Sequence, residues 1–209
     1  MTPQQQIAAM LDLQDGFNQR LDRNWRKAGF AWHRAIWLEC AELMDGHCAW
    51  KWWKGAPDSD PAQARLELVD IWHFLMSWGL VRGGEEAAIA AVVQAIDVGA
   101  SGEAGDIEAV EALARAAVNQ DFAATCAAFI AACRHYRLGS RELYEVYVGK
   151  NALNVHRNTH GYKQGSYIKI WDGREDNEHL AEIMSGGVTD FGAVVQALQE
   201  RYAALTGAR

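Results

Sequence analysis

Two short stretches of the chain each carry a pair of carboxylates, three residues apart, among apolar neighbours. Glu39 and Glu42 form the first pair, and Glu67 and Asp70 form the second. Residues three apart on an α-helix lie on the same face, so each pair would point its carboxylates in one direction. Two such helices packed together would gather four acids. The repulsion between them favours a hard divalent cation with oxygen ligands, either Mg²⁺ or Mn²⁺.

Plain ion pairs are the alternative for these acids. A Glu-x-x-Glu spacing is common on helices and usually belongs to a solvated face. Lys51, Lys54 and Arg65 are the cations that would neutralise the acids in that case. The apolar flanks of both pairs, and the recurrence of the spacing, favour the metal site.

Composition limits the class of protein. The chain has 209 residues, half of them hydrophobic, which is enough for one substantial core with a small subdomain. The formal net charge is −7 and there is no run of Lys or Arg, so non-specific nucleic-acid binding is not expected. The four cysteines, Cys40, Cys48, Cys126 and Cys133, include no Cys-x-x-Cys pair, and we interpret them as reduced core residues.

The N-terminus has neither the basic start nor the apolar run of a secretory signal. The longest apolar stretch, residues 71–81, is too short to span a bilayer. We therefore expect a cytoplasmic protein that has no membrane partner.

Three prolines, abundant alanine and few alternating Val/Ile/Thr runs predict an all-α fold, a helical bundle. Predicted helices begin at Thr2-Pro3 and near residues 28, 61, 85, 106, 121, 140, 177 and 190. Residues 1–82 would form the N-terminal half of a catalytic core with both acidic motifs. Residues 83–138, rich in alanine, would be a helical insertion or mobile subdomain, and residues 139–209 the C-terminal half of the core.

Several polar and aromatic residues are candidates for binding a flat ligand. Gln14 and Asn18, four apart, are either exposed amides or a pair that reads a base edge. The segment 48–55 places Trp50, Trp52 and Trp53 among lysines, as a lid over a ligand or as a plug of the core. His73, three residues beyond Asp70, is either a core residue or a substrate contact.

A basic and amide face follows later in the chain. Lys150, Asn154 and Arg157 have the spacing i, i+4, i+7 on a predicted helix, which suits phosphate binding, although a solvated face is the alternative. The polar, glycine-punctuated stretch 163–177 suits a loop that closes over an anionic ligand.

Taken together, these motifs resemble the dimeric all-α dUTP diphosphatases, within the all-α nucleoside triphosphate pyrophosphohydrolases that include MazG-type enzymes. The matching pieces are Leu13-Gln14-x-x-Phe17-Asn18, Glu39-x-x-Glu42, Trp50-Lys51-Trp52-Trp53-Lys54, Glu67-Leu68-Val69-Asp70, Lys150-Asn151-x-Leu153-Asn154, Arg157, Gly161-Tyr162, Tyr167-x-Lys169-x-Trp171 and Glu175-Asp176-Asn177.

This resemblance implies roles for individual residues. Glu39, Glu42, Glu67 and Asp70 would be the catalytic acids and would hold two or more Mg²⁺ ions. The implied uracil pocket is Gln14, Asn18 and Trp52 or Trp53. The implied phosphate and sugar contacts are Lys150, Asn154, Arg157, Tyr162 and Lys169, and Asn177 would assist one metal or the phosphate. Outside these implied contacts, Lys54 of the tryptophan segment is expected near phosphate, and His73 is a further candidate substrate contact.

The resemblance also implies an activity, namely hydrolysis of dUTP to dUMP and pyrophosphate by metal-activated water, in a homodimer. One alternative is a pyrophosphohydrolase for another nucleotide, such as dCTP or a modified one, because a flipped amide satisfies either uracil or cytosine. A second alternative is a non-catalytic helical binding protein of the same fold.

Overall fold

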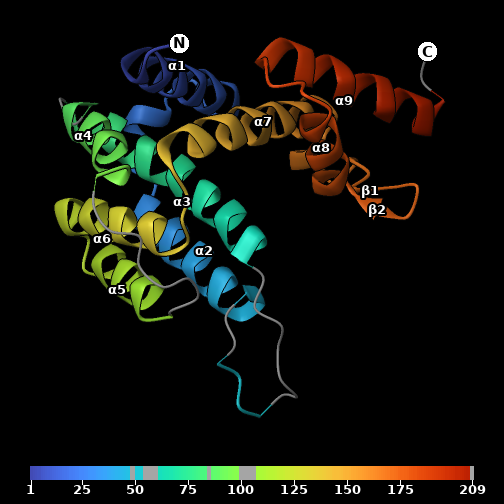
Figure 1. Cartoon of the computed structure of the whole chain (residues 1–209). Coiled ribbons are helices and arrows are strands. Elements are labelled where there is room, and N and C mark those ends of the chain that lie inside the picture. The colour runs from blue at the N-terminus through green and yellow to red at the C-terminus, as the bar shows by residue number, and fades with distance from the viewer. Residues whose placement is uncertain (48–49, 54–60, 84–85, 99–106, 208–209) are drawn as a thin grey trace. The chain divides into compact units, whose positions relative to one another are not determined.

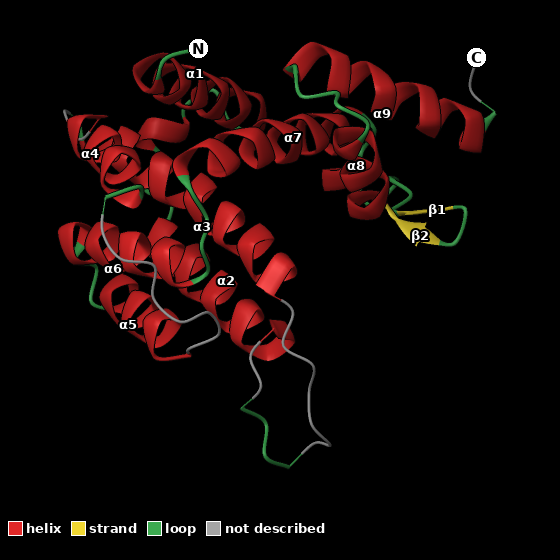
Figure 2. Cartoon of the chain, in the orientation of Figure 1, coloured by secondary structure: helices red, strands yellow, loops and turns green. Residues whose placement is uncertain are grey.

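The computed structural model describes residues 1–47, 50–53, 61–83, 86–98 and 107–207. Its α-helices are α1 (Pro3–Leu21), α2 (Trp32–His47), α3 (Pro61–Arg82), α4 (Glu86–Ile96), α5 (Ile107–Val118), α6 (Phe122–His135), α7 (Ser140–Thr159), α8 (Asp176–Ser185) and α9 (Phe191–Thr206). Short 3₁₀ turns occupy Trp25–Lys27 and Tyr162–Gln164, and the strands are β1 (Ile170–Trp171) and β2 (Arg174–Glu175). The predicted all-α class is confirmed, as Figure 2 shows.

Local capping explains where several of the helices begin. Thr2 accepts a hydrogen bond from the Gln5 amide and Pro3 is the first helical residue, as predicted for α1. Asp121 and Asp190 cap α6 and α9 in the same manner. Helix α2 begins four residues later than predicted, after Gly29, whose φ of +70° lies in the left-handed region that ends a helical path.

The chain forms two compact units, residues 1–144 and 145–209. In the first unit α2 runs alongside α3, α5 packs on α2, and α6 packs on α4 and α5 (Figure 1). Helices α4 to α6 therefore belong to the same unit as the acidic helices, whereas the sequence analysis divided the chain at 82 and 138. The physical reason is that α5 and α6 bury apolar faces against this unit, as the stacking of Phe129 on Trp72 illustrates.

The second unit holds the rest of α7, the two strands, α8 and α9. Its core is made of Ala152, Leu153, Trp171, Leu180, Ile183, Val194, Leu198 and Tyr202. The stretch 163–177, predicted as a loop, contains a hairpin that turns at Asp172-Gly173, with φ values of +48° and +80°. Asp-Gly is a typical two-residue hairpin sequence. Glu175 caps α8, so this helix begins at Asp176, one residue before the predicted start.

The side chains of Cys40, Cys126 and Cys133 are buried free thiols, and Cys48 lies outside the described residues. Burial raises the pKa of Cys40 to about 12, which keeps this thiol protonated.

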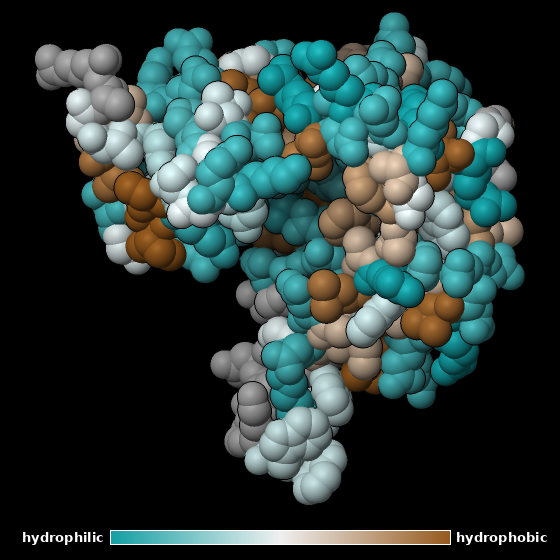
Figure 3. Space-filling view, turned by 180° about the vertical axis from the view of Figure 1, so that it is seen from behind, coloured by the Kyte–Doolittle hydropathy of each residue, from teal (hydrophilic) through white to brown (hydrophobic). Residues whose placement is uncertain are grey.

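Figure 3 shows a face on which hydrophilic side chains predominate. Among the described residues, no helix has both the length and the apolar character that crossing a bilayer requires.

Candidate functional site

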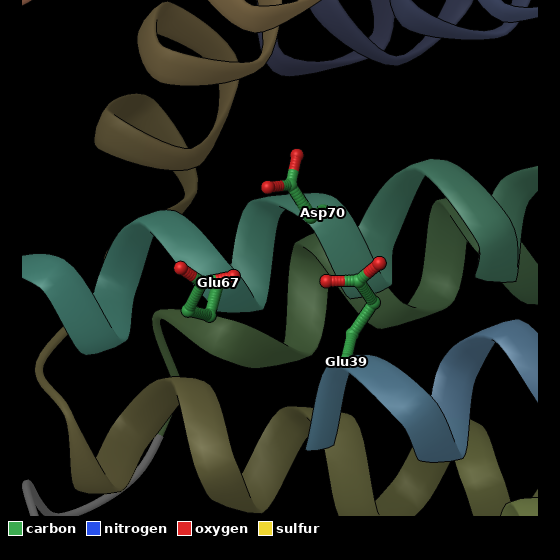
Figure 4. Close-up of side chains that lie close together, drawn as sticks. All are labelled: Glu39, Glu67 and Asp70. Carbon is green, nitrogen blue, oxygen red and sulfur yellow. The ribbon is translucent and has the colours of Figure 1, made fainter. Parts of the chain in front are cut away.

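Two neighbouring helices of the first unit bring three of the four predicted acids together. Glu39 projects from α2 toward Glu67 and Asp70 on α3 (Figure 4). Each side chain offers a carboxylate oxygen, and these three oxygens lie within 4.8 Å of one another. All three residues are half-buried, so the group is only partly screened by water. The two acidic motifs thus lie next to each other in the fold, as predicted.

This group, which we term the carboxylate cluster, has the donor chemistry of a site for a hard divalent cation. Its oxygens carry negative charge and converge from two helices, so a Mg²⁺ or Mn²⁺ ion fits the donor set. Two of the cations considered as neutralising partners have other carboxylates beside them: Lys51 pairs with Asp45, and Arg65 pairs with Glu142 at 3.1 Å. Lys54 lies outside the described residues.

Glu42 differs from the other three acids. It lies on α2, one turn after Glu39, but its side chain is exposed and is not part of the carboxylate cluster. The packing of α2 on α3 thus turns Glu39 toward the partner helix and leaves Glu42 at the rim. Glu42 is therefore an exposed carboxylate three residues from Glu39 on the same helix.

A buried polar group joins α1 to α3. The amide nitrogens of Gln14 and Asn18 each donate to the Oγ of Ser77, both at 2.9 Å, and Gln14 Nε2 also lies 3.3 Å from Asn18 Oδ1. All three side chains are at most 3% exposed. The interpretation of Gln14 and Asn18 as exposed amides is therefore wrong. Sequence reasoning missed Ser77, although it lies four residues after His73.

The polar group and the carboxylate cluster share one face of α3. Asp70, His73 and Ser77 have the spacing i, i+3, i+7, so Ser77 lies about 10 Å along the helix from Asp70. His73 lies between them, 5% exposed, and its Nδ1 is 2.8 Å from the carbonyl oxygen of Val69. One face of α3 thus carries anionic oxygens at one end and the contact with the buried amides of α1 at the other.

The tryptophan segment lies at the surface. Trp52 is 88% exposed and Trp53 is 54% exposed, so the alternative that these rings plug the core is wrong. Trp53 contacts Trp50 and Trp52 edge-on, with ring centroids 5.2 and 5.6 Å apart. Lys51 is buried, and its ammonium group pairs with Asp45. The predicted contact of these rings with a base stays a prediction.

In the second unit, Arg157 is held by a partner that the sequence did not reveal. Its Nε and Nη2 donate to the two carboxylate oxygens of Asp176 at 2.8 and 2.7 Å, and the hydroxyl of Tyr167 donates to the same carboxylate. Asp176 is completely buried. The Arg157 guanidinium lowers the pKa of the Asp176 carboxyl against the opposing effect of burial, which is larger than any other single cause.

The other predicted phosphate contacts differ in their burial and in their partners within this unit. Lys150 is buried and Asn154 is half-buried on α7. Tyr162 is exposed, and the guanidinium carbon of Arg157 lies 5.8 Å from its ring centroid. Lys169 forms an exposed ion pair with Glu175 at 3.1 Å. Asn177 is half-buried, and its Oδ1 has no hydrogen-bond partner within the described part of the chain. Their contact with a substrate stays a prediction.

An aromatic cage in the second unit surrounds His156. The ring lies 4.1 Å from His160 and 5.1 Å from Tyr202, centroid to centroid, with Tyr167 and Trp171 also in contact. Neither ring nitrogen has a hydrogen-bond partner among the described residues. Burial, assisted by His160, lowers the pKa of His156 to about 4. The imidazole is therefore neutral at pH 7.

The second unit is expected to lose stability between pH 7 and pH 5. In this range the unfolded chain protonates His156, whose ordinary pKa is 6.5, while the folded unit excludes the proton until the pH approaches 4. The contribution of neutral His156 to the free energy of unfolding is therefore fully present well above pH 6.5. It falls by about 2 kcal/mol at pH 5. Hydrogen exchange of the α7 amides at the two pH values measures this loss. An equal loss in His156→Gln would contradict it.

Comparison with known proteins yields one family. The family model described as dUTPase matches residues 6–162, which is well over half of the chain. The matched range contains the carboxylate cluster, Glu42, the Gln14–Asn18–Ser77 group and the Lys150–Arg157 face of α7. No curated protein matches the chain.

Proposed function

Because the chain belongs to the dUTPase family, we propose that it hydrolyses dUTP to dUMP and pyrophosphate, with water as the nucleophile. The observation that carries this proposal is the carboxylate cluster, whose α3 residues lie on the same helix face as Ser77, the partner of the buried amides of α1. This arrangement supports a substrate that has a hydrogen-bonding base and a charged phosphate chain.

Glu39, Glu67 and Asp70 are the residues that would hold the divalent cation, Mg²⁺ or Mn²⁺, and the family resemblance implies two or more ions. When bound, such ions neutralise phosphate oxygens and polarise water. The protein's own contribution is to bring three carboxylates together from two helices, and a bound cation would lower the repulsion between them.

Glu42 is the carboxylate best suited to orient and deprotonate the attacking water. It is exposed and lies outside the carboxylate cluster, so its oxygens are available to accept a proton. Gln14 and Asn18 would bind the base, with His73, Trp52 and Trp53 beside it. Lys150, Asn154, Arg157, Tyr162, Lys169 and Asn177 would contact the phosphates and sugar. The homodimer and the cytoplasmic location belong to the same proposal.

A sibling activity is the second candidate, since an enzyme for dCTP or a modified nucleotide would keep the carboxylate cluster and differ at the amides. A non-catalytic binding protein is the third. The presence of the three converging carboxylates favours catalysis over this last possibility.

Release of pyrophosphate from dUTP, dCTP, dTTP and UTP, each with and without Mg²⁺, tests the proposal. We expect release from dUTP that requires the metal. Preference for another nucleotide would retain the metal chemistry and reject uracil as the base. If the folded protein released pyrophosphate from none of them in Mg²⁺, the hydrolase proposal would be wrong.

A further inference from the structure

Arg157 binds Asp176 through only one edge of its guanidinium. Nε and Nη2 donate to the two carboxylate oxygens at 2.8 and 2.7 Å, which is the side-on form of a bidentate pair. The N–H groups that remain lie on Nη1 and on the far side of Nη2, at the outer end of the side chain. Among the hydrogen bonds of the described residues, none is made by this outer end.

The outer end of Arg157 reaches solvent, unlike its carboxylate partner. The side chain of Arg157 is 14% exposed, whereas that of Asp176 is 0% exposed. Nη1 has no partner within the described part of the chain, yet it is not one of the buried side-chain atoms that lack a partner. It is therefore accessible from outside. The pair thus has its carboxylate inside the second unit and the outer end of the guanidinium at the surface.

Two tyrosines fix the position of this guanidinium. The hydroxyl of Tyr167 donates at 2.8 Å to Asp176 Oδ2, the same oxygen that accepts from Arg157 Nε. The ring of Tyr162, which is 54% exposed, has its centroid 5.8 Å from the guanidinium carbon. The residue before it, Gly161, has a φ of +86°, which side chains with a Cβ rarely allow, so the turn that places Tyr162 there depends on glycine. The outer end of Arg157 is therefore held in one place.

The geometry of this end matches a phosphate group. Two N–H groups on a planar fork can donate to two oxygens of one phosphate, while the other edge keeps its carboxylate. A lysine could not serve both partners, because its nitrogen would have to lie at the buried carboxylate to neutralise it. We propose that Asp176 and Tyr167 are positioning residues, which hold Arg157 so that its outer end binds one phosphate group of the nucleotide. This inference rests on the proposed function for the identity of the ligand.

Binding of inorganic pyrophosphate to Arg157→Lys tests the outer end. The Kd is measured by calorimetry on the full chain in Mg²⁺. Lysine keeps the positive charge that Asp176 requires but loses the planar fork, so the Kd is expected to rise about tenfold to a hundredfold, the effect of losing charge-assisted hydrogen bonds. Thermal unfolding confirms that the variant is folded. An unchanged Kd would overturn the inference.

Tyr167→Phe tests the positioning role separately. It removes one hydrogen bond to Asp176, keeps the ring and changes no charge. The Kd for pyrophosphate is expected to rise about threefold. No further rise is expected when the change is added to Arg157→Lys, because the effect passes through Arg157. An equal rise in both backgrounds would show a purely structural effect and reject the positioning role. If Arg157→Lys does not fold, an unchanged Kd in Tyr167→Phe alone would reject that role.

Arg26→Lys is the matched control for the arginine. Arg26 binds Asp15 through the same two nitrogens, Nε and Nη2, but its Nη1 donates to the carbonyl oxygen of Leu80 at 2.9 Å. Its outer end is therefore already used, and the wild-type Kd should persist. A rise as large as in Arg157→Lys would assign the loss to a general effect of the substitution and overturn the inference.

Tyr202→Phe is the matched control for the tyrosine. Tyr202 stacks on Tyr167, with ring centroids 5.3 Å apart, and its hydroxyl accepts from the Ile168 amide at 3.2 Å. The variant loses a hydrogen bond in the same aromatic group without touching Asp176, so its Kd should stay unchanged. A rise equal to that in Tyr167→Phe would reject the positioning role.

The outcomes separate this inference from the proposed function. A protein that hydrolyses dUTP, with an unchanged Kd in Arg157→Lys, would leave the dUTPase proposal standing and overturn the inference. A protein that hydrolyses none of the four nucleotides but loses pyrophosphate binding in Arg157→Lys would reject the dUTPase proposal and support the phosphate contact of Arg157. A folded wild-type protein that binds no pyrophosphate would overturn the inference.

Discussion

Replacement of Asp70 by Asn is expected to lower pyrophosphate release from dUTP by roughly a thousandfold, the scale seen when one group that stabilises charge in a transition state is removed. Asp70 supplies one of three converging carboxylate oxygens, and an amide at this position removes a negative charge without changing shape. The loss should appear in both kcat and the affinity for Mn²⁺, measured by calorimetry on the protein without nucleotide.

The fold should survive this change, because asparagine keeps the shape of this half-buried side chain and lowers the repulsion among the neighbouring carboxylates. Thermal unfolding followed by circular dichroism tests this point. The matched control is Asp12→Asn, an exposed carboxylate on α1, which should keep the wild-type rate. Glu42→Gln should lose turnover and retain most of the Mn²⁺ affinity, because Glu42 lies outside the cluster. Full activity in Asp70→Asn would refute the metal-site assignment.

Replacement of Asp176 by Asn is expected to destabilise the second unit by about 3–5 kcal/mol, the cost of leaving a buried partner charge uncompensated. Asp176 is completely buried and accepts two hydrogen bonds from Arg157 and one from Tyr167. The amide would keep the volume of the side chain, but it cannot neutralise the guanidinium. Urea unfolding at pH 7, with hydrogen exchange of α7 and α8 to locate the effect, measures the loss.

Two variants make this result specific. Asp172→Asn is the same chemical change four residues away, in an exposed hairpin turn, and should alter stability by less than about 0.5 kcal/mol. The double variant Asp176→Leu with Arg157→Met removes both charges and should recover much of the lost stability. If Asp176→Asn and Asp172→Asn were equally stable, the Arg157–Asp176 pair would contribute nothing to the fold.

The local features of this protein were predictable from the sequence. The helix that starts at Thr2-Pro3 forms where its cap and proline predict, because capping depends on neighbours within one turn. The acid spacing likewise placed Glu67 and Asp70 on one face of α3, since three residues make nearly a full turn. The turn at Asp172-Gly173 is equally local, but the stretch that contains it was predicted as a loop.

Partners that are distant along the chain were decided only by the tertiary structure. Ser77 lies 63 residues from Gln14, and nothing in the sequence of α1 shows that its amides turn inward. Arg157 and Asp176 carry the opposite charges of an ion pair, which the sequence shows. Their burial comes only from the packing of the second unit. Glu39 and Glu42 are alike by sequence, and only the packing of α2 on α3 brings Glu39 into the carboxylate cluster and leaves Glu42 exposed. A helix periodicity specifies a face, whereas the partner of that face depends on packing of the whole unit.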